Sequence, residues 1–133
     1  MNTPLSLGIL ATILAGCSDT CANEIVTEIA SPARDFKAVM FRRDCGATTS
    51  YSTQVSILAE GAELSGSGNV YRADDDHGVA AVGEWDGPWA EIRWIGPRKL
   101  LVRYAAGSRI FEQSDGQSGI GVSYEAVERI APN

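Results

Sequence analysis

The chain has 133 residues and a formal net charge of -6. This length suits one domain with a modest core and makes a second domain improbable. The acidic balance argues against nucleic acid as a partner, because duplex binding depends on clustered Lys and Arg residues that neutralise phosphates.

The first 16 residues are predicted to be a helical signal peptide that is cleaved on export. Their apolar run, residues 5–15, is too short to span about 30 Å of hydrocarbon and ends in small residues. Residues 14–17, LAGC, resemble the lipobox of bacterial lipoproteins. In that motif the cysteine, here Cys17, is acylated and becomes the mature N-terminus. The segment before the apolar run departs from the pattern because it has no Lys or Arg. An ordinary cleaved signal peptide is therefore the alternative.

Localisation follows from this motif. Ser18 comes directly after the cysteine, and in Gram-negative lipoproteins a residue other than Asp there usually accompanies the outer membrane. We therefore expect a periplasm-facing protein with lipid in the outer membrane. Residues 17–23 would form a short tether, so the domain should lie close to its membrane. The expected partners are this membrane and an envelope protein.

The three cysteines divide into one lipidated residue and one pair. With Cys17 acylated, Cys21 and Cys45 remain and are predicted to form a disulfide in an oxidising compartment. Free thiols are one alternative. Another is Cys45 acting as a nucleophile with His77, which the neighbouring Asp44 disfavours because a carboxylate does not lower the pKa of a thiol.

Residues 24–133 are predicted to form a single β domain. Residues 24–30 alternate with strand period, placing Ile25, Thr27 and Ile29 on one face. A turn rich in Pro and Asp follows at residues 31–35. Residues 36–43 carry apolar side chains on both faces and are predicted to be a central strand. Residues 51–58 should pair with it as an antiparallel neighbour across a loop of small residues.

The second half of the chain alternates between irregular and regular segments. Residues 60–86 are predicted to be a long excursion with one short strand at 69–73, and such loops are often functional. Residues 89–95 and 99–105 flank a Gly-Pro turn and predict a hairpin. Its register should bring Arg93 near Arg103, with Glu91 or another acid beside them. A last strand pair is predicted between residues 108–113 and 120–127.

The central segment also resembles a known group of proteins. Residues 36–58, FKAVMFRRDCGATTSYSTQVSIL, are similar to a family of small uncharacterised bacterial exported proteins and lipoproteins. The matching pattern includes a Ser-Pro turn, a K-A-V-x-F strand, R-D-C-G-A-T-T and S-T-Q-V-S-I. The resemblance implies export and no particular reaction or ligand.

The candidate binding loop contains the only run of side chains able to bind a metal: Asp74, Asp75, Asp76 and His77. They lack the Asp-x-Asp-x-Asp-Gly spacing of an EF-hand, and one His without a free Cys does not suit zinc. The simplest interpretation is a solvated acidic turn. The alternatives are metal binding and a small metal-dependent or hydrolytic enzyme using this loop.

Aromatic residues extend the candidate binding loop. Trp85 and Trp89 flank a turn at residues 86–88 and could line a groove, although a structural role is the simpler interpretation. Trp94 follows the apolar pattern of its strand and is assigned to the core. The hydroxyls of residues 48–53 lack the Gly-x-Ser-x-Gly context of a hydrolase nucleophile.

Charge is segregated along the chain. Residues 60–91 contain eight acidic groups and one arginine, whereas residues 93–109 contain only basic ones. We expect the two segments to fold onto each other. A surface that docks a partner by charge complementarity is the alternative.

The function best supported by the sequence is that of a non-catalytic envelope binding protein without a cofactor or bound metal. A periplasmic inhibitor or immunity protein is a further alternative. The predicted fold is all-β, mainly antiparallel, either a meander or a sandwich.

Overall fold

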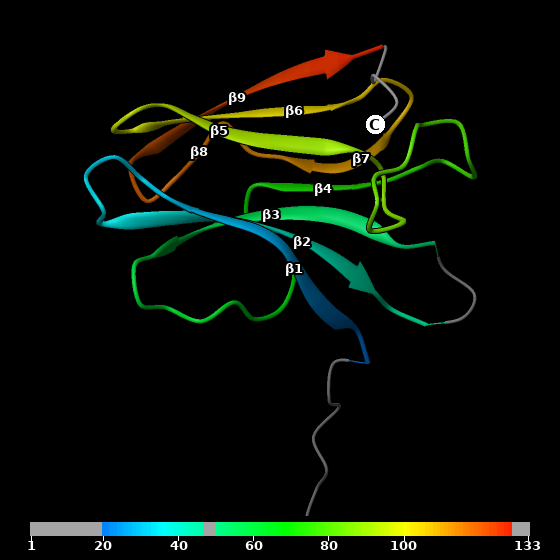
Figure 1. Ribbon diagram of the computed structural model, residues 1–133, viewed down its shortest axis with the longest axis horizontal. Helices are drawn as coiled ribbons and strands as arrows, with labels where there is room; N and C mark the ends of the chain where they lie inside the picture. Colours follow the sequence, from blue (N-terminus) through cyan, green and yellow to red (C-terminus); the bar gives the residue numbers. More distant parts are fainter. Residues whose placement is uncertain (1–19, 47–49, 129–133) are drawn as a thin grey trace, which may run out of the picture.

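The fold is a sandwich of two β-sheets (Figure 1). The computed structural model describes residues 20–46 and 50–128, and within them it contains nine strands and no helix. Accordingly, these ranges offer no helix long and apolar enough to cross a bilayer. The predicted all-β class is confirmed. The predicted signal peptide and Cys17 lie outside the described residues.

Each sheet is mainly antiparallel. The first has the order β1 (Ala22–Ala30), β2 (Phe36–Asp44), β3 (Ser52–Ala59), β4 (Tyr71–Asp74), β7 (Arg109–Gln113). The second has the order β5 (Ala90–Gly96), β6 (Lys99–Ala105), β9 (Ile120–Val127), β8 (Gly116–Gln117). Among the described strands, β6 and β9 are the one parallel pair. The chain thus builds four strands of the first sheet, crosses to the second, returns for β7 and crosses again.

The two predicted hairpins are confirmed. β2 pairs with β3 along their whole length. In the second hairpin Trp94 lies opposite Leu100, so five residues separate them, as the shared apolar face requires. Glu91 Oε1 lies 3.0 Å from Arg93 Nη2 and 3.6 Å from Arg103 Nη1. The predicted acid therefore does separate the two arginines.

The predicted pairing of the last two strands is wrong. β7 pairs with β4 in the first sheet, whereas β9 pairs with β6 in the second. Both strands exist where alternation predicted them. The intervening residues 114–119 carry the chain between the layers and form the short strand β8, so they do not make a hairpin turn between β7 and β9.

The prediction that Ile25, Thr27 and Ile29 share one face of the first strand is wrong for Ile25. A β-bulge lies between Ile25 and Thr27, and an extra residue in one strand reverses which side chains point inward beyond it. Val26 packs against the core. Ile25 lies opposite Phe41 on the outer face, whereas Thr27 and Ile29 lie opposite Met40 and Ala38 on the side that faces the second sheet. The strand also begins at Ala22, two residues earlier than expected.

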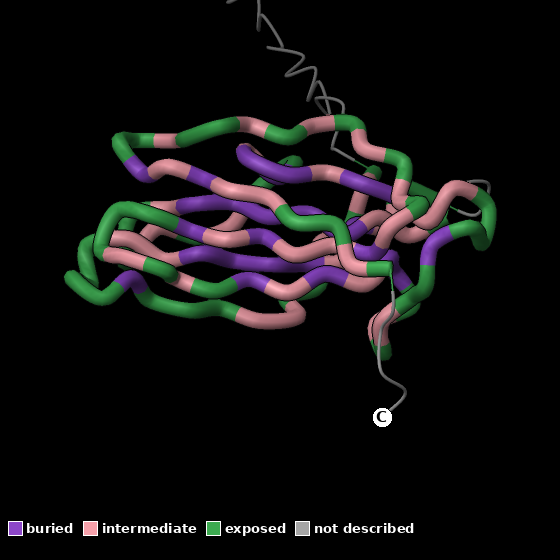
Figure 2. Tube along the Cα trace, turned by 90° about the horizontal axis from the view of Figure 1, so that it is seen from above, coloured by how far each residue is buried: buried purple, intermediate pink, exposed green. Residues whose placement is uncertain are grey.

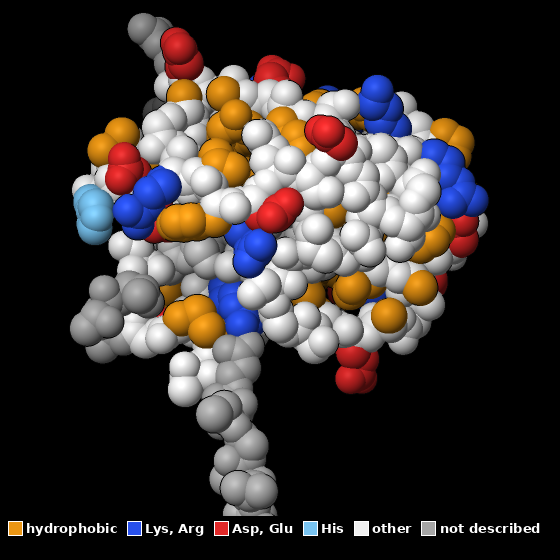
Figure 3. All heavy atoms as spheres, turned by 180° about the vertical axis from the view of Figure 1, so that it is seen from behind, with side chains coloured by type: hydrophobic (Ala, Val, Ile, Leu, Met, Phe, Trp, Pro, Cys, Tyr) orange, Lys and Arg blue, Asp and Glu red, His pale blue; other side chains and the backbone are white. Residues whose placement is uncertain are grey.

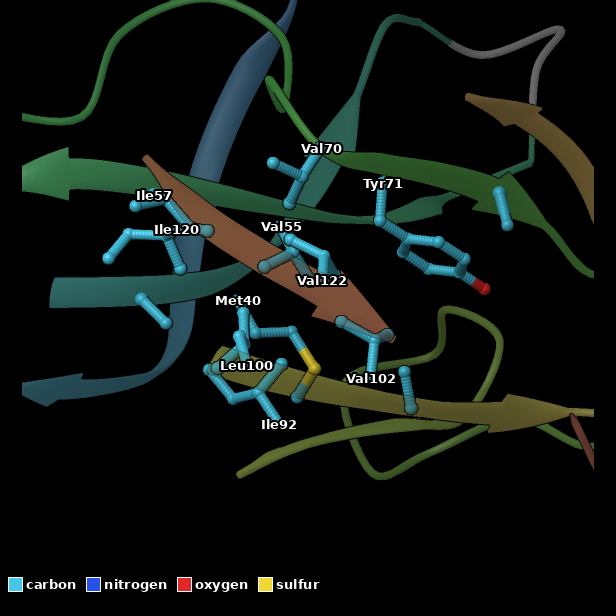
Figure 4. Packing of buried hydrophobic residues seen from close by; sticks show 13 residues of the cluster. Met40, Val55, Ile57, Val70, Tyr71, Ile92, Leu100, Val102, Ile120 and Val122 are labelled. Carbon is cyan, nitrogen blue, oxygen red and sulfur yellow. The ribbon is translucent and has the colours of Figure 1, made fainter. Parts of the chain in front are cut away.

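The core fills the space between the sheets (Figure 2), where the buried stretches of the strands lie. Figure 4 shows side chains from both layers meeting there. Its largest fully buried members include Tyr71 from the first sheet and Leu100 from the second. Strand alternation explains this, because every second side chain of each sheet points to the opposite layer.

A tyrosine links the two layers at one end. The Tyr124 hydroxyl on β9 lies 2.8 Å from the Val70 carbonyl and 2.6 Å from the Ser114 carbonyl. It can donate its single proton to only one of them at a time. Its ring also packs against that of Tyr71, with centroids 6.1 Å apart. This contact fixes the crossover after β7 against the start of β4.

The outer face of β2 is covered as well, as expected for a central strand. Val39 and Phe41 point away from the second sheet yet are only 1% and 0% exposed. Residues 60–69 run back along this face, and both Asn23 and Arg43 donate hydrogen bonds to the Gly66 carbonyl. This irregular segment therefore adds a partial third layer, which ends at the site described next.

Candidate functional site

A cleft of about 470 Å³ opens on the outer face of the first sheet, the face turned away from the second sheet. Its floor comes from β2, β3, β4 and β7, and its rim includes the Cys21–Cys45 disulfide and His77. Side chains alternate between the two faces of a strand. Because Met40, Val55, Tyr71 and Ala73 point into the core, the residues that alternate with them on these strands point outward and form the floor. Figure 3 shows this side of the molecule, where basic, acidic and hydrophobic side chains gather around a hollow toward the left.

Three arginines line the cleft: Arg43, Arg72 and Arg109. Strand pairing brings them together. Arg43 on β2 lies opposite Ser52 on β3, and Gln54, two residues further along β3, lies opposite Phe41 on one side and Arg72 of β4 on the other. Arg109 lies opposite Asp74, the only acidic residue among the described residues of the lining. The lining therefore carries more positive than negative charge, although the whole chain has a formal charge of -6.

The segment of residues 66–68 forms one wall and is held by hydrogen bonds from the floor. Gln54 Oε1 accepts from the Gly68 amide at 2.7 Å, and Arg43 Nη1 donates to the Gly66 carbonyl at 3.0 Å. A Cβ atom at Gly68 would lie 2.7 Å from the Tyr71 carbonyl oxygen and 2.8 Å from that of Val55. Only glycine fits this close approach, so the wall has a fixed position.

A β-bulge on β7 supplies an apolar edge. The register shifts opposite Arg72 and Ala73, and a bulge lets two successive side chains share a face. Phe111 thus lines the cleft with 57% of its surface exposed. Its neighbour Glu112 approaches Arg72 Nη2 at 3.3 Å. The guanidinium of Arg109 lies over the Phe111 ring, 5.2 Å from the centroid.

Asp74 is held ionised within the cleft. Burial alone would raise the pKa of this carboxyl, but hydrogen bonds from Arg109 and from the Asp76 amide outweigh burial, and the pKa is lowered. Arg109 Nε donates to Asp74 Oδ1 at 3.0 Å, and Nη2 donates to Oδ2. The hydrogen bonds to Asp74 raise the pKa of Arg109 in turn. The pair is a bidentate contact of the kind that fixes geometry.

This pair predicts a pH dependence of stability. Because the folded-state pKa of Asp74 lies below its usual value of 3.8, its contribution is fully present above that value and is lost as pH falls through the folded pKa. We expect Asp74→Asn to lower the free energy of unfolding near neutral pH and to have little effect at the acid end. Urea denaturation at several pH values measures this difference.

Glu60→Gln provides the control for that experiment, since Glu60 is exposed and makes no ion pair with the described residues. It should leave the unfolding free energy nearly unchanged at every pH. A constant difference between wild type and Asp74→Asn from neutral to acid pH would contradict the role assigned to the carboxylate.

The structure divides the predicted binding loop. Asp74 and His77 border the cleft, whereas Asp75 and Asp76 are absent from its lining. Asp76 and His77 both have positive φ angles, 50° and 55°, and form the tight turn that aims His77 at the rim. Across residues 20–46 and 50–128, no three His, Cys, Asp or Glu side chains converge to hold a metal ion.

Trp85 faces the opposite way, toward the core. Its Nε1 donates to Thr53 Oγ1 at 2.9 Å, and that hydroxyl donates to the Pro88 carbonyl at 2.6 Å. Gly83 and Gly87 leave room for the indole ring, because a Cβ at either would approach it to 3.0 Å or less. Trp89 is only partly exposed and is not part of the cleft. The structural interpretation of Trp85 is therefore the one its contacts support.

The predicted disulfide between Cys21 and Cys45 is present. β1 and β2 pair with Ala22 opposite Asp44, so the next residue outward on each strand is a cysteine. The Cα atoms of the two cysteines lie 4.0 Å apart. The crosslink thus ties the beginning of the domain to the end of β2, at the rim of the cleft.

The acidic and basic segments meet at two points. Asp74 contacts Arg109, and Glu91 contacts both Arg93 and Arg103. Arg98, in contrast, approaches Asp35 of the β1–β2 turn at 3.3 Å. The two segments therefore contact each other through Asp74 and Glu91.

Sequence reasoning missed the arginines of the cleft. Arg72 and Arg109 are 37 residues apart and become neighbours only through the β4–β7 pairing. The available signal was the strand period, which places Arg43, Gln54 and Arg72 on the outward side of their strands.

Searches with this chain find no matching protein-family model, no matching curated protein and no matching solved structure.

Proposed function

We propose that this protein is an exported, lipid-anchored binding protein without catalytic activity, and that it holds its ligand in the cleft. The observation that carries the proposal is the cleft itself, a preformed recess of about 470 Å³ lined by arginine, serine and glutamine side chains. Small-molecule sites usually have volumes of about 300–1,000 Å³ and a few convergent polar groups. The lipobox-like residues 14–17 and the resemblance to exported bacterial proteins support the cellular location.

The arrangement of the cleft supports a non-catalytic role. Ser50, Ser52 and Ser67 line it together with His77, but none of these serines is hydrogen-bonded to the imidazole. A serine nucleophile needs a base within hydrogen-bond reach. Ser52 instead donates to the Arg43 carbonyl at 3.3 Å and accepts from Gln54 Nε2 at 2.9 Å. Its hydroxyl is engaged in holding the floor.

The anchor is tested by mass spectrometry of the mature protein from a Gram-negative host. We expect Cys17 at the N-terminus with added acyl chains, and release of a Cys17→Ser variant from the lipid-anchored fraction. A mature protein that begins elsewhere and carries no lipid would contradict the anchor and leave the cleft as a separate question.

The binding role is tested by hydrogen exchange of the full-length protein with and without an extract of envelope small molecules. We expect slower exchange in residues 66–74 and 109–113, which border the cleft. The same experiment with Gln54→Ala, which removes the contact holding the Gly68 amide, should show less protection. Protection confined to the second sheet, or none in either protein, would contradict the proposal.

A further inference from the structure

We propose that the cleft binds a phosphate ester, with Arg72 as the residue that recognises the phosphate. This inference rests on the proposed binding function and adds the ligand class. Among the described residues that line the cleft, three arginines outnumber the single carboxylate of Asp74, and this balance favours an anion. Even with Glu112 counted at the edge of the cleft, one positive charge remains on a chain whose formal charge is -6.

Arg72 has hydrogen-bonding capacity left over. Its Nε is buried and has no hydrogen-bond partner among the described residues. Its Nη2 has only the 3.3 Å contact with Glu112, at the surface, where side-chain exposures are 37% and 39%. Such ion pairs contribute little stability, whereas an unsatisfied buried donor costs free energy. Because Nε is enclosed by the protein, an oxyanion bound in the cleft would contact the Nη groups of this partly exposed side chain and displace or share the weak contact with Glu112.

Arg109 and Arg43 are fixed around Arg72 for different reasons. Arg109 is held by its bidentate contact with Asp74. Arg43 is only 6% exposed and donates through Nη1 to the Asn23 side chain and to the Gly66 carbonyl. A planar guanidinium matches phosphate oxygens in pairs. The two fixed arginines thus supply positive potential while Arg72 supplies the direct contact.

The size of the cleft suits an ester. A volume of about 470 Å³ leaves space for an organic group beside the phosphate. Serine hydroxyls suit a polyol portion, and the exposed Phe111 ring suits an apolar one. A glycerol phosphate, free or as a lipid headgroup, combines these features.

The position of the cleft on the chain brings the lipid source within reach. Cys21 lines the cleft and follows the predicted lipidated Cys17 by four residues. Four residues of extended chain span at most about 14 Å. A cleft with excess positive charge at that distance is close enough to attract the headgroups of an anionic bilayer. The test therefore includes a soluble phosphate monoester of glycerol and a lipid phosphodiester of glycerol.

The experiment is isothermal titration calorimetry of the full-length protein in micelles of an uncharged detergent. The probes are glycerol 3-phosphate, short-chain phosphatidylglycerol and, as the neutral counterpart, glycerol. We expect both phosphate esters to bind, glycerol not to bind, and added salt to weaken binding. Tighter binding of the phosphatidylglycerol than of glycerol 3-phosphate would identify a membrane headgroup, and equal or tighter binding of glycerol 3-phosphate would identify a soluble ester.

Arg72→Gln should weaken the binding of both phosphate esters about tenfold or more, as expected for the loss of a charge-assisted contact. Arg93→Gln is the matched control, because Arg93 also pairs with a glutamate at the surface but lies on β5. It should leave affinity unchanged. Arg72→Lys keeps the charge but loses the planar fork, and should fall between wild type and Arg72→Gln.

Each contrary result has a distinct meaning. Glycerol binding as tightly as its phosphate would overturn the phosphate inference and leave the binding function in place. Equal affinity of wild type and folded Arg72→Gln would remove Arg72 as the recognition residue and overturn the inference. No binding of any probe, in a protein whose cleft is still protected by envelope extract, would overturn the ligand class alone.

Discussion

Replacing Leu100 by alanine is expected to lower the free energy of unfolding by about 3 kcal/mol. Leu100 is fully buried on β6, opposite Trp94 of β5 and Val122 of β9. Its side chain points to the first sheet, where Figure 4 shows it close to Met40. Truncation removes apolar contacts with both layers and leaves a cavity that the surrounding strands can fill only in part. Urea denaturation should show a lower midpoint with an unchanged slope.

Leu101→Ala is the matched control for that substitution. Leu101 is the next residue of the same strand and points to the opposite side, where it is partly exposed. Losing it should cost about 1 kcal/mol or less. Equal losses for the two variants would contradict the assignment of Leu100 to the space between the sheets. The free energy of unfolding of a natural domain is about 5–15 kcal/mol, so both variants should remain folded and both losses can be measured.

Short-range features of the fold were predictable from the sequence. The pairing of β2 with β3 and of β5 with β6 follows from period-two alternation on both sides of a turn, because neighbouring strands leave few ways to match apolar faces. The position of Glu91 between Arg93 and Arg103 followed from the same register. The disulfide followed from the cysteine count, since two cysteines remained after the lipidation motif.

Long-range features were not predictable in this way. Alternation located β7 and β9 but could not assign them to sheets, because the pattern of a strand does not specify a partner distant in the sequence. The bulge at Val26 adds one residue to β1, and no Gly or Pro lies there to indicate a bulge from the sequence. The cleft depends on both kinds of feature: it needs the β4–β7 pairing to bring Arg109 to Asp74, and the β7 bulge to turn Phe111 outward.

Removing the Cys21–Cys45 disulfide is expected to lower the free energy of unfolding by roughly 3 kcal/mol, from the loop-closure entropy of the chain it encloses. The cysteines are 24 residues apart in sequence, and in the folded protein the β1–β2 pairing already holds them together. The crosslink therefore acts mainly by restricting the unfolded chain. The double variant Cys21→Ser, Cys45→Ser is the suitable change, because either single variant leaves a reactive thiol.

Urea denaturation of the oxidised protein, the reduced protein and the double variant distinguishes this mechanism from a local packing effect. Reduced protein and double variant should unfold at similar, lower midpoints, and both should still form the β1–β2 pair. Both cysteines border the cleft, so ligand binding by the double variant must be measured as well. We expect the loss in free energy of binding by the folded double variant to be smaller than its loss in free energy of unfolding. A midpoint unchanged by reduction would contradict the stabilising role. A loss of the cleft in a variant that remains folded would instead show that the crosslink positions the site.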